Sequence, residues 1–200
     1  MSKPDVEQSG AVMLKAIHSR RSVRAYSPVP VDSATVQNLL DAAVCAPSAM
    51  HEEPWAFVVV QNRQMLKQLS DQAKPLFIEE VRHRNAHGAS HSFEHLVRPD
   101  FDIFHGAGTL VIICAKPVSP FVAADCWLAA ENLMLAASAA GLGSCVIGSA
   151  VAALNIRKVK AELGIPEEYT AIAPIVVGVP AGGDAPASAR RSPTVLAWKK

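Results

Sequence analysis

Residues 121–148 read FVAADCWLAAENLMLAASAAGLGSCVIG, and this stretch decides the fold. Ser119-Pro120 before it supplies a helix N-cap followed by proline, and Gly141 supplies a stop signal. The helix between these signals is nearly all apolar, so we expect it to be central and buried. No Asp, Glu, Lys or Arg occurs from Asn132 to Ile156, but the glycine-rich turn interrupts this run. We therefore predict a buried helix, a turn and a second buried segment, not a membrane span.

Apolar runs on both sides of this helix predict strands, and the segments between them have helical spacing. We expect strands over 55–60, 109–114 and 172–179, and helices over 13–19, from 33 to the stop at 46–48, over 62–72 and over 155–163, after a loose start at 1–9. Pro174, in the last strand, is tolerated best near a sheet edge or a strand start. Strands alternate with more numerous helices, which indicates one α+β or α/β domain with a small sheet between helices.

The composition restricts the function class. The chain has 200 residues, a mass of 21.2 kDa and a formal net charge of +1. This charge argues against a nucleic-acid binder with a domain-wide positive field. Only 18% of the residues are charged, below the roughly 25% of a typical soluble domain. We therefore expect a partner subunit to cover some apolar surface.

The N-terminus and the cysteines indicate a cytoplasmic location. The first ten residues, MSKPDVEQSG, contain no apolar core of a secretory signal. The four cysteines, Cys45, Cys114, Cys126 and Cys145, form no C-x-x-C pair and stand among apolar neighbours. We expect them to be reduced, buried thiols, as in a cytosolic protein.

The segment His18–Arg24, HSRRSVR, holds three guanidinium groups and two hydroxyls. Forked guanidinium donors together with a hydroxyl suit a phosphate dianion. The same residues also fit a solvated basic helix end, where positive charge lies near the negative end of the helix dipole. The segment alone leaves both interpretations open.

Three further segments carry similar, individually weak signals. APSAMHEEPW at 46–55 is a rigid turn that leads into a strand, GLGSCVIG at 141–148 would let backbone approach a ligand closely, and SARRSP at 188–193 adds a second basic pair. Each also fits an ordinary loop. The chain has neither a G-x-G-x-x-G motif after a strand nor a P-loop lysine.

Taken together and in this order, the segments RRSVRAYSPVPV, APSAMHEEPWAFVVV, AAENLMLAASAAGLGSCVIG and RRSP…W resemble the nitroreductase-like FMN-dependent oxidoreductases. The resemblance covers residues 12 to 198. It implies an α+β fold with a small mixed sheet flanked by helices, in a single FMN-binding domain over 1–200. It also implies an intertwined homodimer with two FMN sites at the interface, each built from both subunits.

Carried over by position, the resemblance implies a set of cofactor-binding residues and no catalytic side chain, because flavin N5 carries the chemistry. One subunit would contribute Arg20, Arg21 and Ser22 at the FMN phosphate and ribityl end, Arg24 at the pyrimidine edge, and the backbone of Val146, Ile147 and Gly148 near N5. Arg191, with Arg190 beside it, would complete the phosphate clamp, and the other subunit would supply Pro47, Ser48, Ala49 and His51.

The activity implied is a ping-pong transfer of hydride from NADH or NADPH, through FMN, to a small acceptor such as a nitroaromatic or a quinone. His51 and Glu53 stand where the family commonly has Asn and Gln. A His-x-Glu-Pro-Trp version occurs in the iodotyrosine deiodinase branch as well as in some nitroreductase-like members, so a reductive dehalogenase is the alternative. A flavin-binding protein without useful turnover is a third hypothesis. The expected lid, residues 74–105, contains no tyrosine to grip a tyrosine substrate, which disfavours the dehalogenase.

Four histidines recur every four residues in the expected lid, at His83, His87, His91 and His95. A His-x₃-His pair on a helix can bind zinc. Gly88 interrupts the helix, however, and neither cysteine nor carboxylate stands at ligand spacing. We expect a lid that faces solvent or substrate, without a metal.

Overall fold

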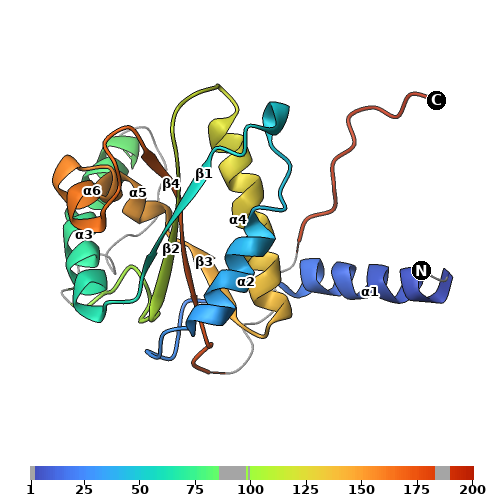
Figure 1. Ribbon diagram of the computed structural model, residues 1–200, viewed down its shortest axis with the longest axis horizontal. Helices are drawn as coiled ribbons and strands as arrows, with labels where there is room; N and C mark the ends of the chain where they lie inside the picture. Colours follow the sequence, from blue (N-terminus) through green and yellow to red (C-terminus); the bar gives the residue numbers. More distant parts are fainter. Residues whose placement is uncertain (1–2, 86–97, 99, 183–189) are drawn as a thin grey trace.

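A four-stranded antiparallel sheet separates two layers of helices in the computed structural model (Figure 1). The structure describes residues 3–85, 98, 100–182 and 190–200. The strand order is β1 (Trp55–Val60), β2 (Thr109–Ala115), β4 (Thr170–Gly178) and β3 (Gly143–Val146). All neighbouring strands run antiparallel. The expected mixed sheet is therefore wrong for the described strands, because apolar runs predict strands but carry no information on their direction.

Each face of the sheet carries its own apolar core. The β2 strand is buried along its whole length, so alternate side chains enter opposite cores. Leu110 and Ile112 belong to the core beneath α3 (Arg63–Asn85), α5 (Val151–Leu154) and α6 (Arg157–Leu163). Val111 and Ile113 belong to the core beneath α2 (Ser33–Ala43) and α4 (Val122–Ala139). Figure 1 shows these two helical layers on opposite sides of the strands.

The α4 helix is the buried central helix that the sequence predicts. Eight of its residues are buried, and it packs against α2 and the sheet. Gly141, with φ +74°, ends the helical segment, and β3 follows it as the expected second buried segment. None of the helices in the described part of the chain has the length and apolar character needed to cross a membrane.

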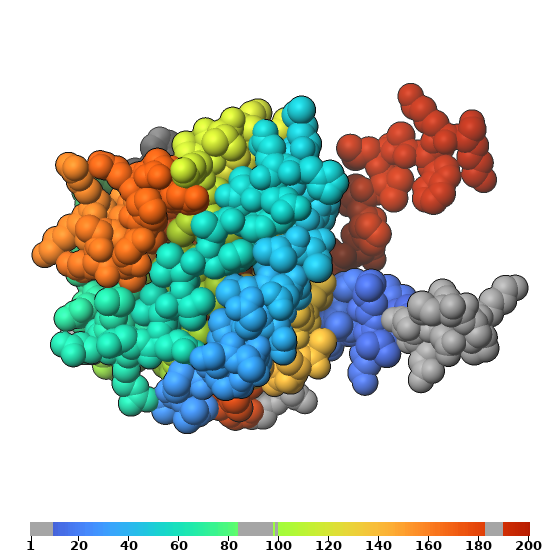
Figure 2. Space-filling model, in the orientation of Figure 1, coloured from blue at the N-terminus to red at the C-terminus, as the bar shows by residue number. Residues whose placement is uncertain are grey.

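The ends of several helices differ from the sequence prediction. The α1 helix runs from Lys3 to Ser19 and projects from the body, so the expected loose start is wrong (Figure 1). The α3 helix continues through Pro75 to Asn85, so the first part of the expected lid is helical. An amphipathic pattern locates a helix better than it locates its ends. Residues 190–200 form an extended tail that leaves the body (Figure 2).

Pro174 lies in the interior of β4, a strand with neighbours on both sides, contrary to the expected edge or strand start. The Pro174 carbonyl accepts a hydrogen bond from the N–H of Ile147, just beyond the end of β3 at Val146. The N–H and C=O of one strand residue point to the same side, so the missing proline donor faces Ile147, which lies just outside β3. The paired residues of β3, 143–146, therefore lose no ladder hydrogen bond to Pro174.

Candidate functional site

The β3 strand brings the basic segment and the glycine-rich turn together. The N–H of Val23 donates to the carbonyl of Ser144 at 3.0 Å, and Ser22 forms an isolated parallel bridge with Ser144. Gly143 makes this approach possible, because an added Cβ there would lie 2.8 Å from the Val23 side chain. Segments more than 100 residues apart in the sequence thus form one surface.

A pocket of about 810 Å³ opens beside this surface. Its volume lies within the range of small-molecule and cofactor sites. The basic segment contributes Arg24, and the end of β3 contributes residues 145–149, including the sequence-predicted Val146, Ile147 and Gly148. The rest of the lining comes from α3 and from the turn at residues 101–106, and consists of Phe77, Glu80, Phe101, Ile103 and His105.

Arg24 supplies exposed positive charge at this pocket. Among the described residues its guanidinium has neither a hydrogen bond nor an ion pair. Burial lowers the pKa of His105, and the nearby charge of Arg24 lowers it further. Burial raises the pKa of the Cys145 thiol, while Arg24, the Ser22 hydroxyl and Arg20 oppose this rise. Of these residues, Arg24 and Cys145 both line the pocket.

Arg20 and Arg21 have different surroundings although they are neighbours in the chain. Arg20 is largely buried, with 18% of its side chain exposed, and its Nε lies 3.5 Å from Oε1 of Glu131 on α4. The guanidinium of Arg21 donates to the backbone carbonyls of His18 and Arg20. Arg21 thus binds free carbonyls at the end of α1, as the solvated-helix-end interpretation expects.

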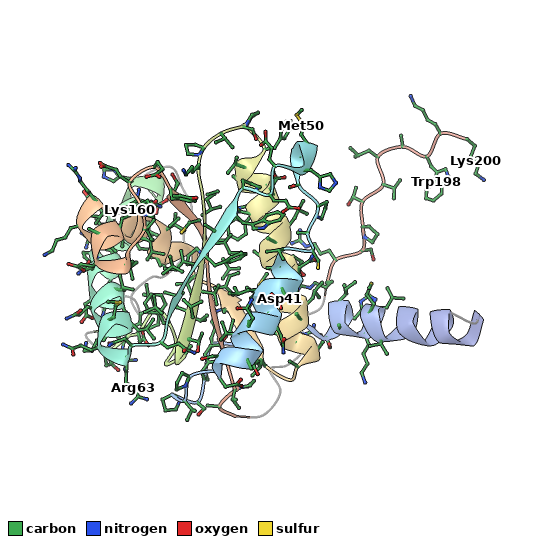
Figure 3. All side chains as sticks on the ribbon, viewed as in Figure 1. Asp41, Met50, Arg63, Lys160, Trp198 and Lys200 are labelled. Carbon is green, nitrogen blue, oxygen red and sulfur yellow. The ribbon has the colours of Figure 1, made fainter. Side chains whose placement is uncertain are left out.

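The segment at 46–55 lies on the α2–α4 side of the sheet. The N–H of Ala49 donates to Oδ1 of buried Asp125 on α4 at 3.2 Å, and Figure 3 shows Met50 beside the start of that helix. Met50, His51 and Glu53 all have positive φ angles, between 43° and 57°. Within one chain, Pro47, Ser48, Ala49 and His51 do not line the pocket.

The second basic pair also lies away from the pocket in a single chain. Arg190 and Arg191 are exposed in the extended tail. The same tail exposes Val195, Leu196 and Trp198, and Figure 3 shows Trp198 far from the body. In a single chain, Arg24 and residues 146–148 therefore line one pocket, whereas residues 47–49, His51, Arg190 and Arg191 lie away from it.

The pocket wall contains residues to which the sequence analysis gave no role. Phe77, Phe101 and His105 all fall within the expected lid at 74–105, for which the sequence predicts no separate role of individual aromatic residues. The Asp-x₃-Gly pattern at Asp102 and Gly106 is a turn signal that could have separated His105 from the rest.

The histidine stripe is only partly visible. His83 is exposed on α3, with Nε2 3.9 Å from the Glu79 carboxylate, while His87, His91 and His95 lie outside the described residues. Over 3–85, 98, 100–182 and 190–200, no group of three or more His, Cys, Asp or Glu side chains could hold a metal ion.

A sequence model of the nitroreductase family matches residues 17–179. The chain belongs to the nitroreductase family. An Archaeoglobus fulgidus relative named "Putative NADH dehydrogenase/NAD(P)H nitroreductase" is 30% identical over 172 residues, which cover 84% of each chain. A Bacteroides fragilis nitroreductase solved with bound FMN superposes with a TM-score of 0.78 at 29% identity, covering 94% of this chain and 98% of the other.

Iodotyrosine deiodinases are also similar to this nitroreductase family member, over a shorter stretch. The Danio rerio iodotyrosine deiodinase is 51% identical over 43 residues, or 22% of this chain and 15% of the relative. The predicted likeness to the deiodinase branch is therefore confirmed, and in sequence it extends over a short stretch of the chain.

Proposed function

We propose that this chain is an FMN-dependent oxidoreductase, a single domain that transfers hydride from NADH or NADPH to a small organic acceptor. The observation that carries this proposal is the pocket lined by both Arg24 and residues 146–148, with Ser22 bridged to Ser144 on the adjoining strand. The FMN in the Bacteroides fragilis nitroreductase, 29% identical to this chain, supports the choice of cofactor.

The residues at the pocket fit an anionic, planar cofactor. Arg24 offers a guanidinium without a partner among the described residues, and the Ser22 hydroxyl is exposed. Gly148 lines the pocket, and a Cβ built on it would meet no atom within 4 Å, so the space above this backbone is open. Guanidinium and hydroxyl donors suit a phosphate, and a bare glycine backbone lets a flat ring approach.

When bound, FMN supplies the two-electron hydride chemistry, so the chain needs only to bind and orient. We assign Arg20, Arg21 and Ser22 to the phosphate and ribityl end. Arg24 lines the pocket and would place positive charge at the pyrimidine edge, where charge stabilises an electron-rich ring. Apolar Val146 and Ile147 line the pocket at the end of β3 and exclude water there.

The remaining site residues require a second copy of the chain, so we propose a homodimer. Pro47, Ser48, Ala49 and His51 would reach the partner's site, and Arg190 and Arg191 would extend with the tail. Exposed apolar side chains on α1, α4 and the tail support this arrangement, among them Met13, Leu128 and Leu196. The four free cysteines agree with the cytoplasmic location expected from the sequence.

The test begins with the purified full-length protein. We expect a yellow protein that releases FMN on heating and sediments at about twice 21.2 kDa. It should oxidise NADH or NADPH in steady state only when a quinone or nitroaromatic acceptor is present. A colourless protein that binds no added FMN would contradict the proposal, and FMN binding without turnover would favour the flavin-binding hypothesis.

A reductive dehalogenase is the second candidate, because of the local match to iodotyrosine deiodinases. Titration of the FMN-loaded protein with 3-iodotyrosine separates the two functions. We expect no saturable change in flavin absorbance, since the segment 74–105 contains no tyrosine. Tight binding followed by iodide release under reducing conditions would establish the second candidate.

A further inference from the structure

The turn at residues 101–106 places two aromatic side chains in the wall of the pocket, and the proposed function gives neither of them a role. The rings of Phe101 and His105 lie edge to face, with centroids 6.1 Å apart and planes at 79°. Both residues line the 810 Å³ pocket and also a neighbouring pocket of about 440 Å³. They therefore occupy the boundary between two cavities, where a bound molecule would meet them.

The turn is held in shape from within by Asp102. Its Oδ1 accepts from the N–H of Phe104 at 3.0 Å, and its Oδ2 accepts from the N–H of Gly106 at 2.9 Å. The Asp102 carbonyl accepts from the N–H of His105 at 3.0 Å. Phe104 is fully buried and anchors the centre of the turn in the core. The direction of the His105 side chain is thus set by backbone that has little freedom.

The α3 helix fixes the same turn from outside. The N–H of Ile103 donates to Oγ of buried Ser70 at 3.2 Å. Nζ of Lys74 donates to the carbonyl of Phe101 at 2.9 Å and pairs with Asp71 at 3.0 Å. Lys74 is itself largely buried, with 13% of its side chain exposed. A rigid turn of this kind can present a side chain to a ligand with little loss of entropy on binding.

His105 combines backbone strain with an unused hydrogen-bonding side chain. Its φ of 56° is in the left-handed region, which non-glycine residues seldom adopt and which is often found at functional sites. The imidazole is half-buried and forms no hydrogen bond with the described residues. Burial and the charge of Arg24 keep its pKa low, while Asp102 acts in the opposite direction. A neutral imidazole offers one N–H donor.

We propose that His105 binds the electron acceptor, donating a hydrogen bond to an oxygen of a planar aromatic substrate of the quinone class. This inference rests on the proposed function, because it places the substrate in the pocket that would also hold FMN. Phe77 and Phe101 supply the apolar and aromatic wall that suits a flat ring, and His105 supplies the polar contact that orients it. His105 is thereby a specificity-determining residue.

The test uses the oxidised, FMN-loaded dimer without NADH or NADPH, so that binding is measured apart from turnover. The probe is tetramethyl-1,4-benzoquinone, which has no free ring position for thiol addition, and flavin absorbance reports its dissociation constant. Its oxygen-free counterpart is 1,2,4,5-tetramethylbenzene. His105→Asn retains a residue that tolerates the left-handed backbone but shortens the side chain. We expect the quinone to bind about 3- to 10-fold more weakly.

Three comparisons make this result specific. His105→Gln, which retains an N–H donor on a longer side chain, should recover part of the quinone affinity. Lys158→Gln alters an exposed side chain of α6, away from the pocket, and should leave it unchanged. The hydrocarbon should bind alike to all variants. In the wild-type protein, the His105 imidazole ¹⁵N resonances should shift on addition of the quinone and not of the hydrocarbon, a measurement that needs no variant.

Two results would overturn the role of His105. One is equal quinone affinity of the wild type and His105→Asn, and the other is imidazole resonances that do not shift when the quinone is added. An equal loss of quinone and hydrocarbon affinity would overturn it too, because this would indicate a general collapse of the pocket. The dissociation constant of FMN separates this outcome from failure of the proposed function. If His105→Asn binds FMN normally and its quinone affinity is unchanged, only the proposed contact of His105 with the substrate is refuted. If the wild-type chain binds no FMN, both proposals are refuted.

Discussion

Val23 packs directly over Gly143, so closely that a Cβ at position 143 would lie 2.8 Å from both Cβ and Cγ2 of Val23. The contact joins the basic segment that follows α1 to the first residue of β3. The backbone hydrogen bond from Val23 to Ser144 runs beside it. This small contact determines where Arg20, Ser22 and Arg24 stand relative to the pocket.

Gly143→Ala should therefore damage both stability and cofactor binding. The added methyl overlaps Val23 in a buried strand, and overpacking of this kind costs typically 1–3 kcal/mol. We expect chemical denaturation to show a loss of that size and FMN affinity to fall as the basic segment shifts. Gly143→Ala combined with Val23→Gly, which also removes the overlapping Cβ of Val23, should restore part of both. A Gly143→Ala protein as stable as wild type would show that the contact is not tight.

Gly148→Ala should separate cofactor binding from stability. A Cβ at Gly148 meets nothing within 4 Å in the chain, and its φ is not in the left-handed region. The unfolding free energy should thus stay the same or rise by about 0.4–1 kcal/mol. FMN affinity should nevertheless fall, because the methyl occupies space at the pocket wall. Unchanged FMN affinity would place the flavin elsewhere.

The thiols should differ sharply in reactivity. Cys45 is exposed, whereas Cys114, Cys126 and Cys145 are buried, which corrects the expectation that all four are buried. Burial raises the pKa of Cys114 to about 11 and that of Cys126 to about 12. At pH 8, a disulfide reagent should modify one thiol per chain rapidly and the others only on unfolding. Cys45→Ser should abolish the rapid phase; its persistence would contradict the burial described.

His105 should titrate below its usual pKa of 6.5, because burial and Arg24 both disfavour the imidazolium. An unfolded histidine takes up its proton first as the pH falls, so His105 stabilises the fold above pH 6.5 and loses that contribution below it. Imidazole NMR should show the lowered pKa, and Arg24→Ala should raise it. A His105 pKa above 6.5 in the wild-type protein would contradict the pocket electrostatics.

Much of the fold follows from local sequence signals. The strand at 55–60 has the predicted bounds, and the helix predicted from residue 33 begins there as α2. The carboxylate of Asp32 accepts a hydrogen bond from the N–H of Thr35 and caps this helix. Gly164, in the left-handed conformation, ends α6. These features depend on residues close together in the chain, which is why a single sequence predicts them.

The features that the sequence does not predict depend on distant partners. The direction of each strand is determined only when the sheet assembles. The same holds for the position of Pro174, in the interior of β4 and opposite Ile147. The site shows the same division. Arg24 and residues 146–148, all predicted from sequence motifs, line one pocket, whereas the pairing of Arg20 with Glu131 and the turn at His105 come from tertiary packing.

Arg20 and Arg24 test the central claim, because a solvated helix end would treat them alike. Arg20→Ala should weaken FMN binding by roughly 10- to 150-fold, the loss of a charge-assisted hydrogen bond worth about 1.5–3 kcal/mol. It should leave the flavin potential almost unchanged, since the phosphate is charged in every redox state. The matched control is Arg157→Ala, which removes an exposed guanidinium on α6.

The most direct measurement is the two-electron midpoint potential of the flavin in Arg24→Ala, with Arg20→Ala measured alongside. In the proposed arrangement Arg24 faces an edge of the flavin that gains negative charge on reduction. Its loss should therefore lower the potential, by about 30 mV for each ~1.4 kcal/mol of differential stabilisation. We expect this shift in Arg24→Ala and not in Arg20→Ala. Identical potentials in both variants, with equal losses of FMN affinity, would contradict the placement of the flavin beside Arg24.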